Sequence, residues 1–163
     1  MVLELELERG RLELDLAYLG IPVVHLGVGD ELAVRPADLF HAGYSTPDSG
    51  AVHFHRARDP DLAILYGPHL PLAPGYYQFI MEIESDAIRG VPLGTLRASS
   101  KWVAARPLAI MEAGTTVWDL RVTEDLPMRF EFVYSRKADL SINSILLRRL
   151  ESPSGQNSLG SPD

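Results

Sequence analysis

Hydrophobic and acidic residues alternate strictly at the start of the chain. The alternation runs from Leu3 to Glu8, stops at Arg9-Gly10, and resumes from Leu12 to Leu16. Alternation with period two is typical of a β-strand that has one face in water. Two such segments around a glycine-containing turn predict a β-hairpin over residues 1–16. Five acidic residues and two arginines lie in this hairpin, and its like charges discourage pairing of its edge with another strand.

Short apolar segments continue along the rest of the chain, separated by Gly, Pro, Asp and Ser. They cover residues 21–26, 31–34, 51–55, 62–66, 76–83, 94–98, 108–112, 116–122, 128–134 and 140–147. Roughly ten strands with turn residues between them predict an all-β fold, an antiparallel sandwich or barrel. Single helical turns fit only near residues 36–40 and 85–89. We expect one domain over residues 1–150 and a flexible tail over 151–163, which has little apolar surface to bury.

Composition narrows the possible function classes. The chain has 163 residues, a formal net charge of −7 and no cysteine. The missing cysteine excludes disulfides, thiolate metal ligands and a cysteine nucleophile. The acidic balance argues against nucleic acid as a partner, because phosphate binding requires clustered Lys and Arg. The apolar runs are too short to cross a membrane, and the N-terminus lacks the features of a signal peptide, so we expect a cytoplasmic protein.

His53 and His55 are candidates for a metal site. Residues i and i+2 of a strand project from the same face, so the two imidazoles suit one divalent transition metal, as in the cupin barrels. Asp59 is the candidate third ligand, with His69 and His41 as alternatives. The match to the cupin pattern is partial, and a metal site needs a full ligand set. We therefore expect no cofactor, and a cupin-like metalloprotein is the alternative.

No motif predicts catalysis. Glu82 and Glu84 form a possible acid and base pair, but they alternate with Met81 and Ile83 and therefore predict the wet face of a strand. The chain has no nucleophile elbow, no phosphate-binding glycine loop and no dinucleotide fingerprint. We assign no catalytic residue.

Trp102 is the aromatic residue best placed to contact a ligand. It follows the polar stretch from Arg97 to Lys101 and is expected on a loop. Aromatic faces beside polar side chains bind sugar rings by stacking and hydrogen bonds. Trp118, in contrast, lies within an apolar segment and is expected to lie in the core or to be half-buried in a strand.

Two stretches resemble the galactose-binding-like jelly rolls over about residues 62–150. The first reads LAILYGPHLPLAPGYYQF from Leu62, with a Gly-Pro break and a Pro-Gly turn. The second comprises PMRFEFVY from Pro127 and the closing LSINSILLRR from Leu140. The resemblance implies an antiparallel β-sandwich of jelly-roll type that acts as a non-catalytic carbohydrate-binding module. It also places Asn143 at a polar position of the closing strand and Trp102 in a variable ligand loop.

From this resemblance we expect a carbohydrate site on loops at one end of the sandwich. Its candidate residues are Trp102, Arg97, His69, Asn143 and Tyr44. A further alternative is a structural or assembly subunit. In that case the acidic hairpin of residues 1–16 would pair edge to edge with a partner protein or with a second copy of the chain, as in a homo-oligomer.

Overall fold

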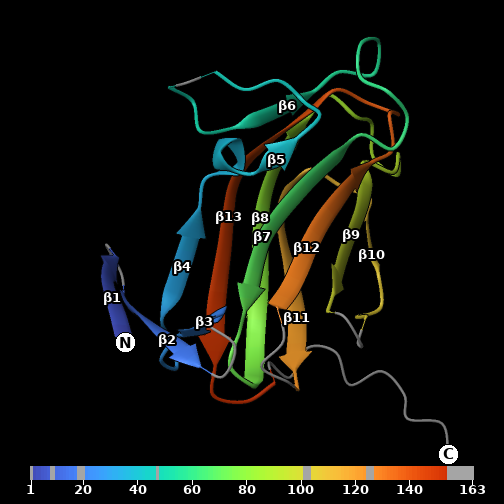
Figure 1. The fold of residues 1–163 in the computed structure, drawn as a ribbon. Helices are drawn as coiled ribbons and strands as arrows, with labels where there is room; N and C mark the ends of the chain where they lie inside the picture. Colours follow the sequence, from blue (N-terminus) through green and yellow to red (C-terminus); the bar gives the residue numbers. More distant parts are fainter. Residues whose placement is uncertain are drawn as a thin grey trace, which may run out of the picture.

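The computed structural model describes residues 2–7, 10–17, 21–46, 48–100, 104–123 and 127–153. For the strands before residue 26 it describes the backbone only. Two antiparallel sheets pack face to face, and a smaller sheet lies at the N-terminus (Figure 1). We name the two large sheets after their central strands. The β12 sheet has the order β10 (Leu108–Ile110), β9 (Gly94–Ser99), β12 (Pro127–Tyr134), β7 (Ile64–Pro71) and β5 (Phe40–His41). The β13 sheet has the order β11 (Gly114–Val122), β8 (Gly75–Ser85), β13 (Leu140–Leu150) and β4 (Glu31–Val34), and β6 (Val52–Phe54) also pairs with β13.

The chain changes sheet at almost every connection from β4 to β13, as in a jelly roll. The predicted all-β antiparallel sandwich is therefore confirmed. The helical turn expected near residues 36–40 is the short 3-10 helix η1 (Pro36–Asp38). The helical turn expected at 85–89 is wrong, because β8 stays paired with β13 as far as Ser85 and residues 86–88 have no regular structure. Within the described residues, no helix is long and apolar enough to span a membrane.

Aromatic rings from both sheets join the two layers of the sandwich. Phe79 of β8 stacks on Phe130 of β12, with ring centroids 4.9 Å apart. Phe54 of β6 packs against Phe132 and Tyr134 of β12 at 6.1 and 5.1 Å. The Tyr134 hydroxyl donates a hydrogen bond to the Ala138 carbonyl oxygen, and burial raises the pKa of Tyr134 to about 12. The interior is thus filled by apolar side chains, and ligand contacts must come from the outer faces or the loops.

A β-bulge lies at the centre of each large sheet. In β7, Gly67 and Pro68 lie opposite the single residue Phe130, and Gly67 adopts a φ of 118° that favours glycine. We predicted that the strand ends at Tyr66 and that His69 lies in a loop. Both expectations are wrong, because the bulge accommodates the extra residue and pairing with β12 continues to Pro71.

The predicted N-terminal hairpin is confirmed as the strands β1 (Val2–Leu7) and β2 (Gly10–Ala17), to which β3 (Ile21–His25) adds a third strand. β3 contacts β7, and β2 contacts β4. In the described part of the chain β1 pairs with β2 alone and so forms an edge. Its pairing with a partner or a second copy stays a prediction. Of the tail expected at residues 151–163, residues 154–163 lie outside the described part of the chain.

Candidate functional site

A row of aliphatic side chains crosses the outer face of the β13 sheet, which we call the β13 face. The strand pairing aligns four residues from four adjacent strands, namely Val117, Ile80, Leu146 and Ala33. Their sequence neighbours Phe79 and Leu147 are buried in the core, so the alternation of a strand directs the row outward. Val117 is 51% exposed. The result is an apolar strip in contact with water.

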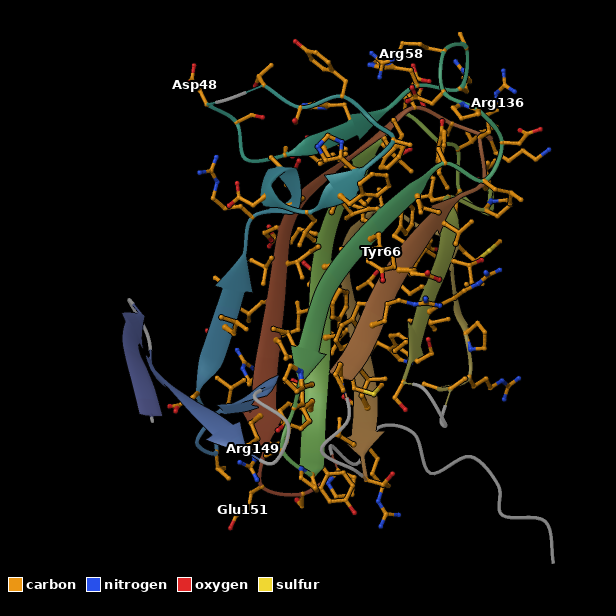
Figure 2. The ribbon with its side chains drawn as sticks, viewed as in Figure 1. Asp48, Arg58, Tyr66, Arg136, Arg149 and Glu151 are labelled. Carbon is orange, nitrogen blue, oxygen red and sulfur yellow. The ribbon has the colours of Figure 1, made fainter. Side chains whose placement is uncertain are left out.

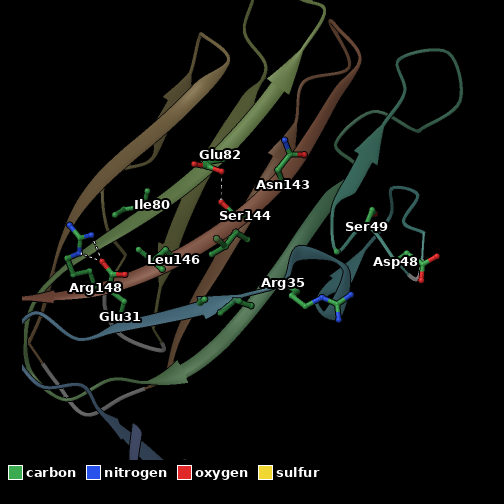
Figure 3. Close-up of a pocket in the computed structure, with 14 residues that line it drawn as sticks. Glu31, Arg35, Asp48, Ser49, Ile80, Glu82, Asn143, Ser144, Leu146 and Arg148 are labelled. Atoms are coloured by element: carbon green, nitrogen blue, oxygen red, sulfur yellow. Dashed lines mark hydrogen bonds and ion pairs between the residues drawn. The ribbon is translucent and has the colours of Figure 1, made fainter. Parts of the chain in front are cut away.

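Three hydrogen-bonding side chains lie beside this strip at the bulge of β13. Asn143 and Ser144 both lie opposite Glu82, because β13 has one more residue than β8 at this point. The Ser144 hydroxyl donates to a Glu82 carboxylate oxygen over 3.0 Å (Figure 3). The Ser141 hydroxyl donates to the Asn143 side-chain oxygen over 3.0 Å. The Asn143 amide nitrogen has no partner among the described residues and remains a donor for a ligand.

A second polar row follows on the other side of the aliphatic strip. Arg148 of β13 donates two hydrogen bonds to the same carboxylate oxygen of Glu31 on β4. The hydrogen bond from the Arg148 Nε spans 2.7 Å. Gln78 of β8 donates from its amide nitrogen to Asp119 of β11 over 3.1 Å. These hydrogen bonds hold the side chains of the row in place, and the ion pair compensates the charge of Arg148.

An open groove of about 720 Å³ lies over part of these rows. Its floor includes Ile80, Leu146 and Ala33 of the aliphatic strip, flanked by Glu82, Asn143 and Ser144 on one side and by Glu31 and Arg148 on the other. Figure 3 shows Glu82, Asn143 and Ser144 at one end of the groove and the pair of Glu31 and Arg148 at the other. Residues 48–50 and Arg35 line the groove as well. The backbone nitrogen of Ala37 donates to the Gly50 carbonyl oxygen over 3.0 Å, which ties this loop to η1. The groove thus lies where β13 exchanges its partner β4 for β6.

Tyr44 continues the β13 face beyond the bulge. Its backbone exchanges two hydrogen bonds with His53, which pairs in turn with Ser141 of β13. Cross-strand partners share one face, so Tyr44 and Asn143 belong to the same side of the sandwich. The Arg58 guanidinium lies 5.5 Å from the centre of the Tyr44 ring and donates to the Asp59 carboxylate over 2.9 Å.

Asp59 and Asp139 hold the loops at this end of the molecule. Burial alone would raise the pKa of Asp59, but hydrogen bonds from the Arg58 side chain and the His55 backbone outweigh it and lower this pKa. The backbone hydrogen bond from Arg56 lowers the pKa of Asp139. His55 Nδ1 lies 3.5 Å from an Asp139 carboxylate oxygen.

These contacts count against the metal site considered from the sequence. The Asp59 carboxylate accepts a hydrogen bond from the His55 backbone nitrogen over 2.7 Å. It does not form a group with the imidazoles of both His53 and His55. The ring nitrogens of His41 contact the Gly43 carbonyl oxygen and the Ser45 hydroxyl. In the described part of the chain, no three His, Asp or Glu side chains are grouped in a way that could hold a metal ion.

The described residues predicted to bind carbohydrate do not converge on one end of the sandwich. Asn143 and Tyr44 lie on the β13 face. Arg97 is exposed on β9 of the other sheet, and the backbone of His69 pairs with Arg129 near the start of β12. The start of β12 and the strand β6, which Tyr44 adjoins, lie at opposite ends of the sandwich (Figure 1). Trp102 lies outside the described residues. The predicted binding roles of all five stay predictions.

Sequence reasoning missed the aliphatic row and the loop at residues 48–50. Each member of the row has a sequence signal, an apolar residue at a position that alternation assigns to water, such as Ile80 between Phe79 and Met81. The alignment of these residues across four strands has no such signal, because it depends on the pairing register. Trp118 is half-buried against the core as predicted, and Glu82 and Glu84 are exposed as predicted.

No protein-family model and no curated protein matches the chain. Several solved structures are similar to it. The C-terminal CBM6 of LamC, a marine laminarinase from Zobellia galactanivorans, aligns with a TM-score of 0.47 and 12% identity, covering 74% of this chain and 100% of the module. The ligand-free CBM1 of BiXyn10A aligns with a TM-score of 0.49 and 12% identity, covering 75% and 98%. The CBM36-1 domain of a multidomain xylanase from the hindgut metagenome of Trinervitermes trinervoides aligns with a TM-score of 0.43 and 11% identity, covering 72% and 96%.

Proposed function

We propose that this protein is a non-catalytic module that binds a neutral carbohydrate chain in the groove of the β13 face. The observation that carries the proposal is the arrangement of the groove floor. On this floor, Ile80, Leu146 and Ala33 lie between two rows of hydrogen-bonding side chains, and Val117 extends the aliphatic strip beyond the groove. A pyranose ring has an apolar face of C–H groups and a rim of hydroxyls, so it fits a strip with this order of apolar and polar groups.

The electrostatics of the floor favour a neutral sugar over a charged one. Arg148 is already held by Glu31, and the Glu82 carboxylate accepts the Ser144 hydroxyl. On the floor of the groove, a ligand carboxylate would have to displace the Glu31 pair or lie near Glu82, and both cost free energy. Arg35, at the rim, is itself ion-paired with Asp38 at 3.9 Å. Sugar hydroxyls instead can donate to Glu82 and accept from the Asn143 amide nitrogen without breaking the existing pairs.

The strip also favours a chain over a single sugar. It spans four strands, and adjacent strands lie about 4.8 Å apart, which gives a length of about 14 Å from Val117 to Ala33. The two ends of the strip are open to solvent, since Val117 and Ala33 are both exposed. A polysaccharide can therefore cross the face without a chain end having to enter a pocket.

Asn143→Ala tests the proposal. We expect isothermal titration with soluble neutral β-glucan, xylan and galactan oligosaccharides to identify a ligand for the parent protein. Loss of the amide donor should weaken its binding by about two- to tenfold, which corresponds to one hydrogen bond. Arg97→Ala on the other sheet is the matched control and should leave this affinity unchanged. Equal affinity of Asn143→Ala and the parent, or no binding of any neutral oligosaccharide, would contradict the proposal.

A further inference from the structure

A second row of outward side chains crosses the other large sheet, on the outer surface that we call the β12 face. Strand pairing aligns four residues from β5, β7, β12 and β9, namely Phe40, Tyr66, Glu131 and Arg97. The neighbours Leu65, Phe130 and Leu96 are buried in the core, so this row points away from it. The row lies on the opposite side of the sandwich from the groove.

One half of the row is aromatic. Phe40 is 68% exposed on the edge strand β5, and Tyr66 lies next to it on β7, where Figure 2 labels it. The Arg129 guanidinium lies 5.6 Å from the centre of the Tyr66 ring. An exposed phenylalanine ring beside a half-buried tyrosine offers flat apolar surface and a hydroxyl group, the combination on which sugar rings stack.

The other half of the row is cationic. Arg97 is exposed and makes no ion pair with any described residue. Glu131, the acid of the row, is held by Arg129 at 3.3 Å, which compensates its charge. Among the described residues of this row, Arg97 therefore leaves an excess of positive charge.

This local charge is opposite in sign to that of the whole chain, which carries a formal net charge of −7. General attraction between the protein and a polyanion is therefore unfavourable, so binding of an anionic ligand depends on local cations such as Arg97. The distance from Phe40 to Arg97 is three strand spacings, or about 14 Å. A ligand that uses both halves must carry an anionic group at that distance from a stacking ring.

We propose that the β12 face is a second binding site, for an anionic saccharide. Its sugar rings pack on Phe40 and Tyr66, and its carboxylate or sulfate group binds the guanidinium of Arg97. The site is independent of the groove on the β13 face, with which it shares no residue. Loss of either binding activity can therefore be separated from loss of the other.

Two substitutions on the full chain test the site. Titration at low salt with an oligogalacturonate, which carries carboxylates, and with a heparin-derived oligosaccharide, which carries sulfates, should show binding of at least one of them. Arg97→Ala should weaken that binding by about tenfold, because a charge-assisted pair is lost. Phe40→Ala should weaken it by about three- to tenfold, because stacking is lost. Asn143→Ala on the β13 face is the matched control and should leave it unchanged.

The two acidic ligands distinguish a carboxylate from a sulfate as the recognised group, and either one supports the site. Three results would overturn the proposal. The first is no binding of either acidic oligosaccharide at low salt. The second is a loss in Arg97→Ala with no loss in Phe40→Ala, which indicates unspecific charge attraction. The third is tighter binding of a single-stranded DNA oligonucleotide than of both saccharides. Phe40 and Arg97 are exposed, so neither variant is expected to unfold, and circular dichroism verifies this.

Discussion

On the β13 face the central row of outward side chains is aliphatic, whereas on the β12 face the corresponding row holds Phe40, Tyr66, Glu131 and Arg97. Both rows cross four strands of one sheet, and both lie near a β-bulge. Arg148 on the β13 face is ion-paired with Glu31, while Arg97 on the β12 face makes no ion pair with any described residue. The alternation of each strand directs residues outward, and their identity along the register then decides which chemical groups each face presents.

The largest effect should come from the core that supports both faces. Phe130→Ala removes a ring that is 1% exposed and stacks on Phe79 across the two sheets. We expect the free energy of unfolding to fall by about 3–5 kcal/mol, measured by urea denaturation. Phe40→Ala removes the same ring from the surface of the β12 face and should change stability by less than about 0.5 kcal/mol. Similar losses in the two variants would contradict the assignment of Phe40 to the outer surface.

An intermediate effect is expected at Asp59, which positions Arg58 over Tyr44 at the end of the β13 face. Asp59→Asn should lower the free energy of unfolding by about 1–3 kcal/mol at pH 7, because hydrogen bonds to a buried carboxylate are weakened. The pKa of Asp59 is lowered in the folded state, so its stabilisation is present above its unfolded pKa, near 3.9, and is lost as pH falls below that value.

The difference between parent and Asp59→Asn should therefore shrink in thermal melts taken below about pH 4. Asp61→Asn is the control, since Asp61 is exposed and lies 3.5 Å from Arg136, and its effect should be close to zero. A stability difference for Asp59→Asn that stays constant from pH 7 to pH 3 would exclude a role for the ionised carboxylate.

The smallest effect should come from the ion pair at the far end of the groove. Glu31→Gln removes the charge that holds Arg148, and because Arg148 is partly exposed the cost should be at most about 1 kcal/mol. The guanidinium of Arg148 would then lie in the groove without a carboxylate partner, as Arg97 does on the β12 face. We therefore expect Glu31→Gln to gain affinity for acidic oligosaccharides, with Glu84→Gln as the control. Unchanged affinity would show that the pairing of Arg148 does not set the preference of the groove for neutral sugars.

Much of the fold could be predicted from the sequence because its strands follow local rules. Alternation placed Met81 and Ile83 in the core and Glu82 and Glu84 in water, as the structure shows. Glycine and proline mark most strand ends. Where they do not, as at Gly67-Pro68, the bulge depends on pairing with Phe130, more than sixty residues away in the chain, and no local pattern reports it.

The candidate sites could be predicted only in part, for the same reason. The resemblance to jelly-roll modules singled out Asn143 on the closing strand, and this residue does line the groove. Arg97 could be singled out as a cation at the end of the segment 94–98, but its grouping with Tyr66 and Phe40 requires the register of three strand pairs. The sequence alone also grouped Arg97 with Asn143, and the structure separates them onto opposite faces.

The sequence by itself therefore determined that this protein is a β-sandwich and which of its residues face water, because both follow from a period of two along each strand. The tertiary structure alone decided which outward residues are neighbours. Sheet order and register come from contacts between distant segments, and shifting one strand by a single residue would turn each of its side chains to the other face. The aliphatic strip of the β13 face and the aromatic and cationic row of the β12 face exist only because that register is set.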